Sequence, residues 1–121
     1  MAESQLLVQT IKDAVVINFR HGSILDSLII DAIARELYAL ADERAARKIV
    51  LDFGGVKFLA SQAIGVLITL KKKADEIGGE IAICGMRDEI KRVFKIMKLD
   101  GIFRFHGSEA AALESMGIHT A

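Results

Sequence analysis

Two side chains, Asp52 and Ser61, stand at places where a protein can carry a phosphoryl group. Asp52 comes near the end of the apolar run Lys48–Phe53, which is typical of a buried central strand. An aspartate there can accept a phosphoryl group when an acidic pair holds Mg²⁺ and a lysine holds the phosphate. The segments after the first two predicted strands, Lys12-Asp13 and Arg20-His21, hold no acidic pair, and the last strand ends in His106-Gly107 without a lysine. Phosphoacceptor chemistry on Asp52 is therefore the alternative hypothesis and not the leading one.

Ser61 opens a predicted helix, and two interpretations of it stay open. Serine is among the preferred N-cap residues, so its hydroxyl can simply cap the helix, and physics alone favours this reading. The hydroxyl can also be displayed at the helix N-terminus, where free N–H groups and the dipole favour an added phosphate by about 0.3–1 kcal/mol. A phosphate would bring about −1.5 to −2 charges beside Phe58 and Leu59. Such a charge would repel a partner docked on that surface.

The remaining reactive groups predict neither a cofactor nor a metal site, and the chain is not expected to be an enzyme. Cys84, the single cysteine, closes an apolar strand and is interpreted as a small buried hydrophobe. The three histidines are scattered and there is one cysteine, a pattern that does not predict a zinc site. No phosphate-binding glycine motif and no Gly-x-Ser-x-Gly elbow occurs.

Charge and hydropathy exclude two classes of partner. Lys plus Arg number 16 and Asp plus Glu number 16, so the formal net charge is +0 and no global field attracts nucleic acid or anionic lipid. No apolar run approaches the roughly 18 residues that a membrane span needs. The N-terminus lacks the pattern of a signal peptide. These features predict a cytoplasmic protein with no nucleic-acid or membrane partner.

The hydrophobic pattern of the 121 residues alternates between two periods and predicts one α/β domain. Strands are expected at Leu6–Ile11, Ala14–Phe19, Lys48–Phe53, Glu80–Cys84 and Ile102–Phe105. Helices are expected from about Ser27 to Arg44, Ser61 to Ile77, Arg87 to Lys98 and Glu109 to Met116, with Asp26 or Ser27 capping the first and Ser108 the last. This order predicts a mixed, mostly parallel sheet of about five strands, opened by a β-hairpin and flanked by about four helices.

The apolar stripes of the first three helices indicate which of their faces is buried. They are Ile29, Ile33, Leu37 and Leu40; then Ala63, Leu67, Leu70, Ala74 and Ile77; and then Ile90, Val93, Phe94 and Met97. Ile96 lies off the third stripe and is expected to contact a second copy or a partner, which makes a homodimer one expectation. Sites in such sheets gather in the loops outside the carboxyl ends of the strands. Here these loops are Arg20–Leu25, Gly54–Ala60 and Gly85-Met86.

The segment Val50–Leu67 resembles the signature of STAS domains, the sulfate-transporter and anti-sigma-factor-antagonist family. The family pattern runs apolar-Asp-Leu-Ser-Gly-Val-x-Phe-Met-Asp-Ser-Ser-Gly-Leu-Gly, and the register needs no gap. Similar pieces occur at Gly22–Asp26, Gly78–Gly85, Leu99–Phe103 and Ser108–Leu113. The resemblance covers about Gln5 to Leu113 and implies a STAS-like single domain over residues 5–116.

The resemblance implies a binding module of bacterial signalling. Its partner would be an anti-sigma factor that is also a serine kinase, and phosphorylation at the start of the second helix would break the complex until a phosphatase restores it. The family's Asp-Ser-Ser-Gly becomes Ala60-Ser61-Gln62-Ala63 here. Ser61 then matches the first serine, and Gln62 replaces the usual acceptor. One residue along a helix turns a side chain by about 100°. Either Ser61 is the acceptor, or the site is silent and the protein is a constitutive binder or a scaffold subunit of a stress-sensing complex.

The same resemblance and the predicted loops together give the expected docking surface. It comprises Ser23, Asp26, Phe58, Leu59, Ala60, Ser61, Gln62, Gly65, Gly85, Met86 and Arg87. Phe58, Leu59 and Met86 would supply apolar contact if they are exposed. Two other hypotheses stay open. One is a receiver-like phosphoacceptor or enzyme that uses Asp52. The other is a lipid or nucleotide binder, which only the free N–H groups of the second predicted helix support.

Overall fold

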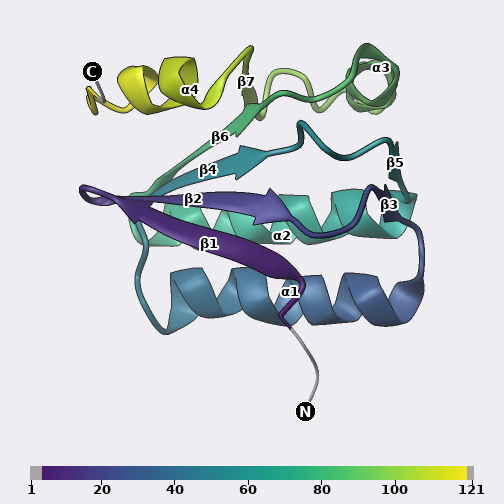
Figure 1. The fold of residues 1–121 in the computed structure, drawn as a ribbon, viewed down its shortest axis with the longest axis horizontal. Helices are drawn as coiled ribbons and strands as arrows, with labels where there is room; N and C mark the ends of the chain where they lie inside the picture. Colours follow the sequence, from purple (N-terminus) through teal and green to yellow (C-terminus); the bar gives the residue numbers. More distant parts are fainter. Residues whose placement is uncertain (1–3, 120–121) are drawn as a thin grey trace.

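The computed structural model describes residues 4–119, which form one sheet with helices on both faces and a short two-stranded ladder at one end (Figure 1). Four helices and seven strands lie within these residues. In chain order they are β1 (Leu6–Ile11), β2 (Ala14–Phe19), β3 (Ser23–Ile24), α1 (Ser27–Asp42), β4 (Lys48–Asp52), β5 (Phe58–Leu59), α2 (Ser61–Glu76), β6 (Glu80–Cys84), α3 (Asp88–Ile96), β7 (Arg104–His106) and α4 (Glu109–Ser115).

The five-stranded sheet has the order β1-β2-β4-β6-β7. β1 and β2 are antiparallel and joined by the two-residue turn Lys12-Asp13, in which Lys12 takes a positive φ of 54°. Every other pair in this sheet is parallel. This arrangement confirms the predicted mixed sheet opened by a hairpin. No helix within the described residues is long and apolar enough to cross a membrane.

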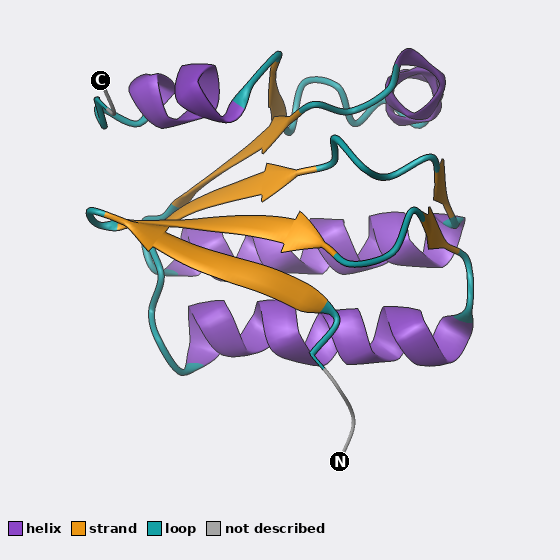
Figure 2. Ribbon diagram, viewed as in Figure 1, coloured by secondary structure: helices purple, strands orange, loops and turns teal. Residues whose placement is uncertain are grey.

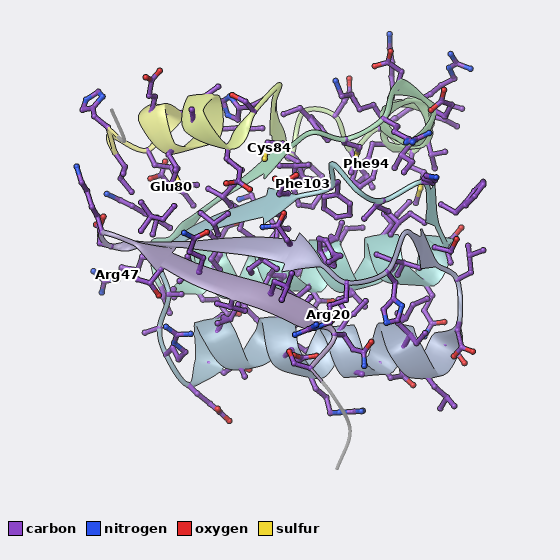
Figure 3. All side chains as sticks on the ribbon, in the orientation of Figure 1. Arg20, Arg47, Glu80, Cys84, Phe94 and Phe103 are labelled. Carbon is purple, nitrogen blue, oxygen red and sulfur yellow. The ribbon has the colours of Figure 1, made fainter. Side chains whose placement is uncertain are left out.

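Side chains of the central strands alternate between two hydrophobic layers, because successive residues of a strand point to opposite faces. Ile49 and Leu51 of β4 pack with α1, α2 and α3, whereas Val50 packs with α4. In Figure 3, Phe94 and Phe103 lie on the α3 side of the molecule; their rings meet edge to face, with centroids 5.8 Å apart. The sheet is thus buried on both faces in its middle, which explains why β4 and β6 read as continuous apolar runs.

The structure corrects the last predicted strand. We expected Ile102–Phe105, but β7 is Arg104–His106. The backbone turns tightly just before it, with the N–H of Ile102 donating to the carbonyl of Leu99 over 3.0 Å. Phe103 is buried by this turn, and Ile102 is left 46% exposed. An apolar run alone cannot distinguish such a turn from the start of a strand.

The predicted burial of the helices also needs correction. In α1 the first buried residue is Ile30 and not Ile29, which is only partly buried; Ile33, Leu37 and Leu40 are buried as predicted. In α3 only Ile90 and Phe94 are buried, whereas Val93 and Met97 are 40% and 44% exposed. α3 lies at the periphery of the fold and contacts the core along a narrow stripe (Figure 1). Two of its four predicted core residues therefore face solvent.

The carboxyl ends of β4 and β6 approach so closely that only glycine fits at position 85. Gly85 has a φ of +68°, and a Cβ there would lie 3.1 Å from Oδ1 of Asp52 and 3.1 Å from Cα of Gly54. Both the backbone conformation and the contact penalise any larger residue.

We expect Gly85→Ala to lower the free energy of unfolding by about 2 kcal/mol or more, because left-handed strain and a backbone contact add. The control is Gly107→Ala, whose Cβ would meet nothing within 4 Å and which we expect to cost less than about 0.5 kcal/mol. Urea unfolding followed by circular dichroism measures both. Equal stability of the two variants would contradict the close approach.

Candidate functional site

The chain segments that follow β2 and β4 are hydrogen-bonded to each other just before α1 and α2 begin. β3 and β5 form a parallel ladder that pairs Ser23 with Phe58 and Ile24 with Leu59 (Figure 2). The N–H of Lys57 donates to the carbonyl of Gly22 over 2.7 Å, and the N–H of Ala60 donates to the carbonyl of Ile24 over 2.9 Å. Only Ala60 lies between the end of this ladder and the start of α2. The ladder therefore fixes where the first turn of α2 lies.

The N-terminus of α2 has no side-chain cap. Ala60 occupies the N-cap position, and Ser61 is the first helical residue, so the interpretation of Ser61 as a plain N-cap is wrong. Ser61 is exposed, and its hydroxyl makes no hydrogen bond within residues 4–119. The first turn holds no acidic residue. The N–H groups of Ser61 and Gln62 are therefore left without an intrahelical acceptor.

Gln62, which follows Ser61 in the first turn of α2, contacts α1. Its Nε2 donates to Oδ1 of Asp31 over 3.3 Å. Asp26 caps α1 as predicted, accepting at Oδ1 from the N–H of Leu28 over 2.8 Å. The two helix starts thus differ: α1 is capped by a carboxylate, and α2 is open.

Large apolar side chains surround this open helix start. Phe58 is 59% exposed, Leu25 56% and Leu28 77%. Leu59 is half-buried and packs against the core. We call the surface formed by Leu25, Leu28, Phe58, Ser61 and Gln62 the tip surface. Leu25 belongs to the predicted site loop Arg20–Leu25, but Leu28 was not predicted, although its place two residues after the cap residue Asp26 could have indicated exposure.

A surface groove of about 340 Å³ adjoins Phe58 and separates it from α3. Lys57, Arg87 and Glu89 form its polar rim, and Ile90 and Val93 contribute to its apolar wall. Arg87 lies here as predicted, although Val93 was expected to be buried.

The predicted docking residues do not all reach the surface. Met86 is only 5% exposed and belongs to the core, so it cannot supply the apolar contact that we expected from it. Gly85 is half-buried against Gly54. The other predicted positions lie at or near the tip surface or the adjoining groove: Ser23, Asp26, Phe58, Ser61, Gln62, Gly65 and Arg87 are exposed, and Leu59 and Ala60 are half-buried.

Asp52 is engaged in contacts that hold the fold together. Strand register aligns it with Asn18 on β2 and with Cys84 on β6. Its Oδ1 accepts from the N–H of Gly54 over 2.8 Å, and its carboxyl is hydrogen-bonded to that of Glu109 at the start of α4. These contacts give Asp52 a structural role and do not favour the phosphoacceptor hypothesis.

The contact with Asp52 changes the protonation of Glu109. The pKa of Glu109 is raised above its ordinary value of 4.5, first by the hydrogen bond to Asp52, then by burial and by the charge of Asp52, while a hydrogen bond with Asn18 acts in the opposite direction. Two carboxyl groups that share a site favour one shared proton. Folding therefore favours the protonated form of Glu109.

Cys84 is buried and sits on the α4 side of β6 (Figure 3). Burial, together with the charges of Asp52 and Glu109, raises the pKa of its thiol to about 12. The thiol therefore stays protonated at neutral pH and behaves as the small hydrophobe that the sequence predicts.

A family model for the STAS domain matches residues 5–112. The chain belongs to the STAS domain family. Over 89 residues, this STAS domain is 27% identical to BtrV, a candidate anti-sigma factor antagonist of Bordetella bronchiseptica. That alignment covers 74% of this chain and 76% of the relative.

Solved structures share the STAS fold. An anti-sigma-factor antagonist (STAS) domain protein from Planctomyces limnophilus matches with a TM-score of 0.84 at 23% identity, over 93% of this chain and 98% of the other. The phosphorylated form of SpoIIAA, a cell fate determinant of Bacillus, matches with a TM-score of 0.72 at 16% identity, over 92% and 98% of the two chains. These likenesses confirm the predicted fold.

The raised pKa of Glu109 makes the stability of this STAS domain depend on pH. Its contribution is fully present below about 4.5, the ordinary value, and is lost as pH rises through the higher value of the folded state. Glu109→Gln keeps a hydrogen-bond donor for Asp52 and cannot ionise. We expect the free energy of unfolding of this variant not to fall in that pH range. At neutral pH it should exceed that of the wild type by less than about 1 kcal/mol, because the site is partly exposed to solvent.

Urea unfolding at a series of pH values checks this expectation. Glu114→Gln, an exposed glutamate on the same helix, is the matched control and should follow the wild-type curve. If the curves of wild type and Glu109→Gln run parallel across the whole range, Glu109 does not share a proton with Asp52.

Proposed function

We propose that this STAS domain is an anti-sigma factor antagonist, which acts by binding an anti-sigma factor with serine kinase activity. The observation that carries the proposal is the tip surface, where Phe58 and Leu28 are 59% and 77% exposed beside an uncapped helix start. Large apolar side chains exposed together mark protein-binding surfaces. Membership of the STAS family and the description of BtrV support the same function.

Ser61 is the residue through which a kinase would switch this binding. Its hydroxyl is exposed and unbonded within the described residues, so it can reach a kinase without disturbing the fold. A phosphate on it would lie near the free N–H groups at the start of α2, and the helix dipole would stabilise it by about 0.3–1 kcal/mol. The same phosphate would place about −1.5 to −2 charges beside Phe58. Docking of an apolar partner surface would then require desolvating that charge.

A second function rests on Gln62. Its side chain is bonded to Asp31 and offers no hydroxyl at the family's usual acceptor position. A kinase that is shaped for that position would find an amide held against α1. The tip surface would then bind its partner constitutively, as in a scaffold subunit of a stress-sensing complex.

The two functions differ in the effect of a negative charge at position 61. For the switch, we expect the source cell's kinase-like partner to be retained by immobilised wild type and by Ser61→Ala, and to lose affinity at least tenfold for Ser61→Asp. A pull-down with identification by mass spectrometry, followed by calorimetry on the partner, measures this. Equal affinity for all three chains would favour the constitutive binder.

The modified residue can be mapped directly. After incubation with the partner kinase and ATP, we expect phosphate on Ser61, and none on a Ser61→Ala chain treated in the same way. Peptide mass spectrometry locates it. Modification at Ser23 or Thr69 instead would contradict the assignment of Ser61.

Phe58 should dominate the affinity for the partner, because exposed aromatic side chains are frequent hot spots. We expect Phe58→Ala to weaken binding at least tenfold without loss of fold, since the ring is 59% exposed. Ile102→Ala is the matched control: Ile102 is 46% exposed and lies beside Gly101 and Arg104, away from the start of α2. Calorimetry compares the two variants. An equal effect of both would remove Phe58 from the interface.

A further inference from the structure

The outer edge of β1 is long, uncharged and uncovered by any other described strand. β1 spans six residues, Leu6–Ile11, and none of them carries a charge. It ends the sheet, because within residues 4–119 it pairs only with β2 (Figure 1). Leu7 and Val8 are 50% and 43% exposed. Open edges of this kind readily accept another strand.

Hydrogen bonds already present show which backbone groups of β1 point outward. The N–H of Arg20 donates to the carbonyl of Gln5 over 3.1 Å, so the backbone carbonyl of Gln5 points toward the β2 side. The Ser4 hydroxyl donates to the carbonyl of Leu6 over 2.9 Å and accepts from its N–H over 3.3 Å. The backbone N–H and C=O groups of Leu6 therefore point away from β2. Backbone direction alternates along an antiparallel strand. Val8 and Thr10 therefore also face outward, and no partner meets their N–H and C=O groups within the described part of the chain.

The opposite edge of the sheet is protected in the usual ways. β7 has only three residues, and its exposed Arg104 approaches Glu80 with a nitrogen–oxygen distance of 3.4 Å. Short strands and charged side chains both discourage pairing with another chain. β1 has neither protection. The contrast indicates that the β1 edge accommodates a strand and the β7 edge does not.

We propose that β1 pairs antiparallel with β1 of a second copy of this chain, about a two-fold axis that passes through Gln9. Val8 of each copy then lies opposite Thr10 of the other. The N–H and C=O groups of Val8 and Thr10, four on each strand, all find partners in the other copy. The Ser4 hydroxyl already hydrogen-bonds to the N–H and C=O groups of Leu6, so the pairing ends before Leu6 on its N-terminal side. The edge is therefore self-complementary in this register. The two sheets join into one of ten strands.

Side chains and charges fit a second copy. Antiparallel pairing brings the start of one β1, where the Glu36 carboxylate accepts from the N–H of Gln5, beside the turn of the other, where Lys12 lies. The acidic neighbour of Lys12, Asp13, is already paired with Lys48 at 3.1 Å. Lys12 donates to the carbonyl of His119 over 2.8 Å but forms no ion pair within the described residues, so its charge can approach the Glu36 carboxylate of the other copy at both ends. The interface is small, so the dimer should be concentration-dependent.

The register places Gln9 directly opposite Gln9 of the other copy, which gives a specific test. Like charges directly opposite each other on paired strands are destabilising, and opposite charges are stabilising. Gln9 is exposed, so a charged side chain there should leave the fold intact. We expect the wild type to move from its 13.2 kDa monomer mass toward about twice that between about 10 μM and about 1 mM in sedimentation equilibrium. Gln9→Lys and Gln9→Glu alone should each weaken association at least tenfold.

An equimolar mixture of Gln9→Lys and Gln9→Glu should restore association to the wild-type level or above. Thr69→Lys, a charge on an exposed position of α2, is the control and should associate as wild type does. A wild type that stays monomeric throughout would overturn the proposal. Association that survives in both single variants, or a mixture that fails to recover it, would also overturn it, since the contact would then lie elsewhere.

A second pair of variants tests the backbone. Thr10→Pro removes an outward N–H and no bond to β2, and edge strands tolerate proline there. Thr10→Val keeps that N–H. Circular dichroism first checks that both variants are folded. The dimer association constant should then fall at least tenfold for Thr10→Pro and stay unchanged for Thr10→Val. Equal association of the two would overturn the proposed pairing.

Discussion

The β3–β5 ladder is the contact on which the geometry of the tip surface depends. It joins the segments that follow β2 and β4, and each segment leads within a few residues into a helix. Because Ala60 donates its N–H to Ile24, the backbone that enters α2 is held against the backbone that enters α1. Leu28 and Phe58, which are remote in the sequence, consequently share one surface with Ser61. Without this ladder, the loop would lose conformational entropy when it became ordered on binding, and the affinity for the partner would be lower.

The sequence predicts most of the fold because the decisive signals are local. Asp26 and Ser108 cap their helices as expected, since a cap bonds to N–H groups only two or three residues away. The errors lie where the outcome depends on distant packing. Phe103 packs against Phe94 on the α3 side, and the strand starts two residues later than the apolar pattern indicates. Val93 faces solvent because α3 meets the core along a narrow stripe.

The site is less predictable, because its features join segments far apart in the chain. The sequence pattern indicates Asp52 but not Glu109, whose carboxyl reaches Asp52 only after β7 and α4 are in place. It places Ser61 at a helix start, but the cap position depends on backbone dihedral angles, and the ladder assigns it to Ala60. Met86 reads as a loop residue, yet the tight approach at Gly85 turns its side chain into the core.

Two exposed apolar regions of this STAS domain obey different constraints. The tip surface consists mainly of side chains on helix and ladder ends, and its free backbone groups are the N–H groups of Ser61 and Gln62. It therefore suits a partner that contributes side-chain pockets. The β1 edge offers backbone groups, which only an extended strand can satisfy. Because Ser61 lies on the first and Gln9 on the second, a charge added by phosphorylation at Ser61 would act on partner docking. Self-pairing through β1 depends on Val8 and Thr10, so the two associations are separable by substitution.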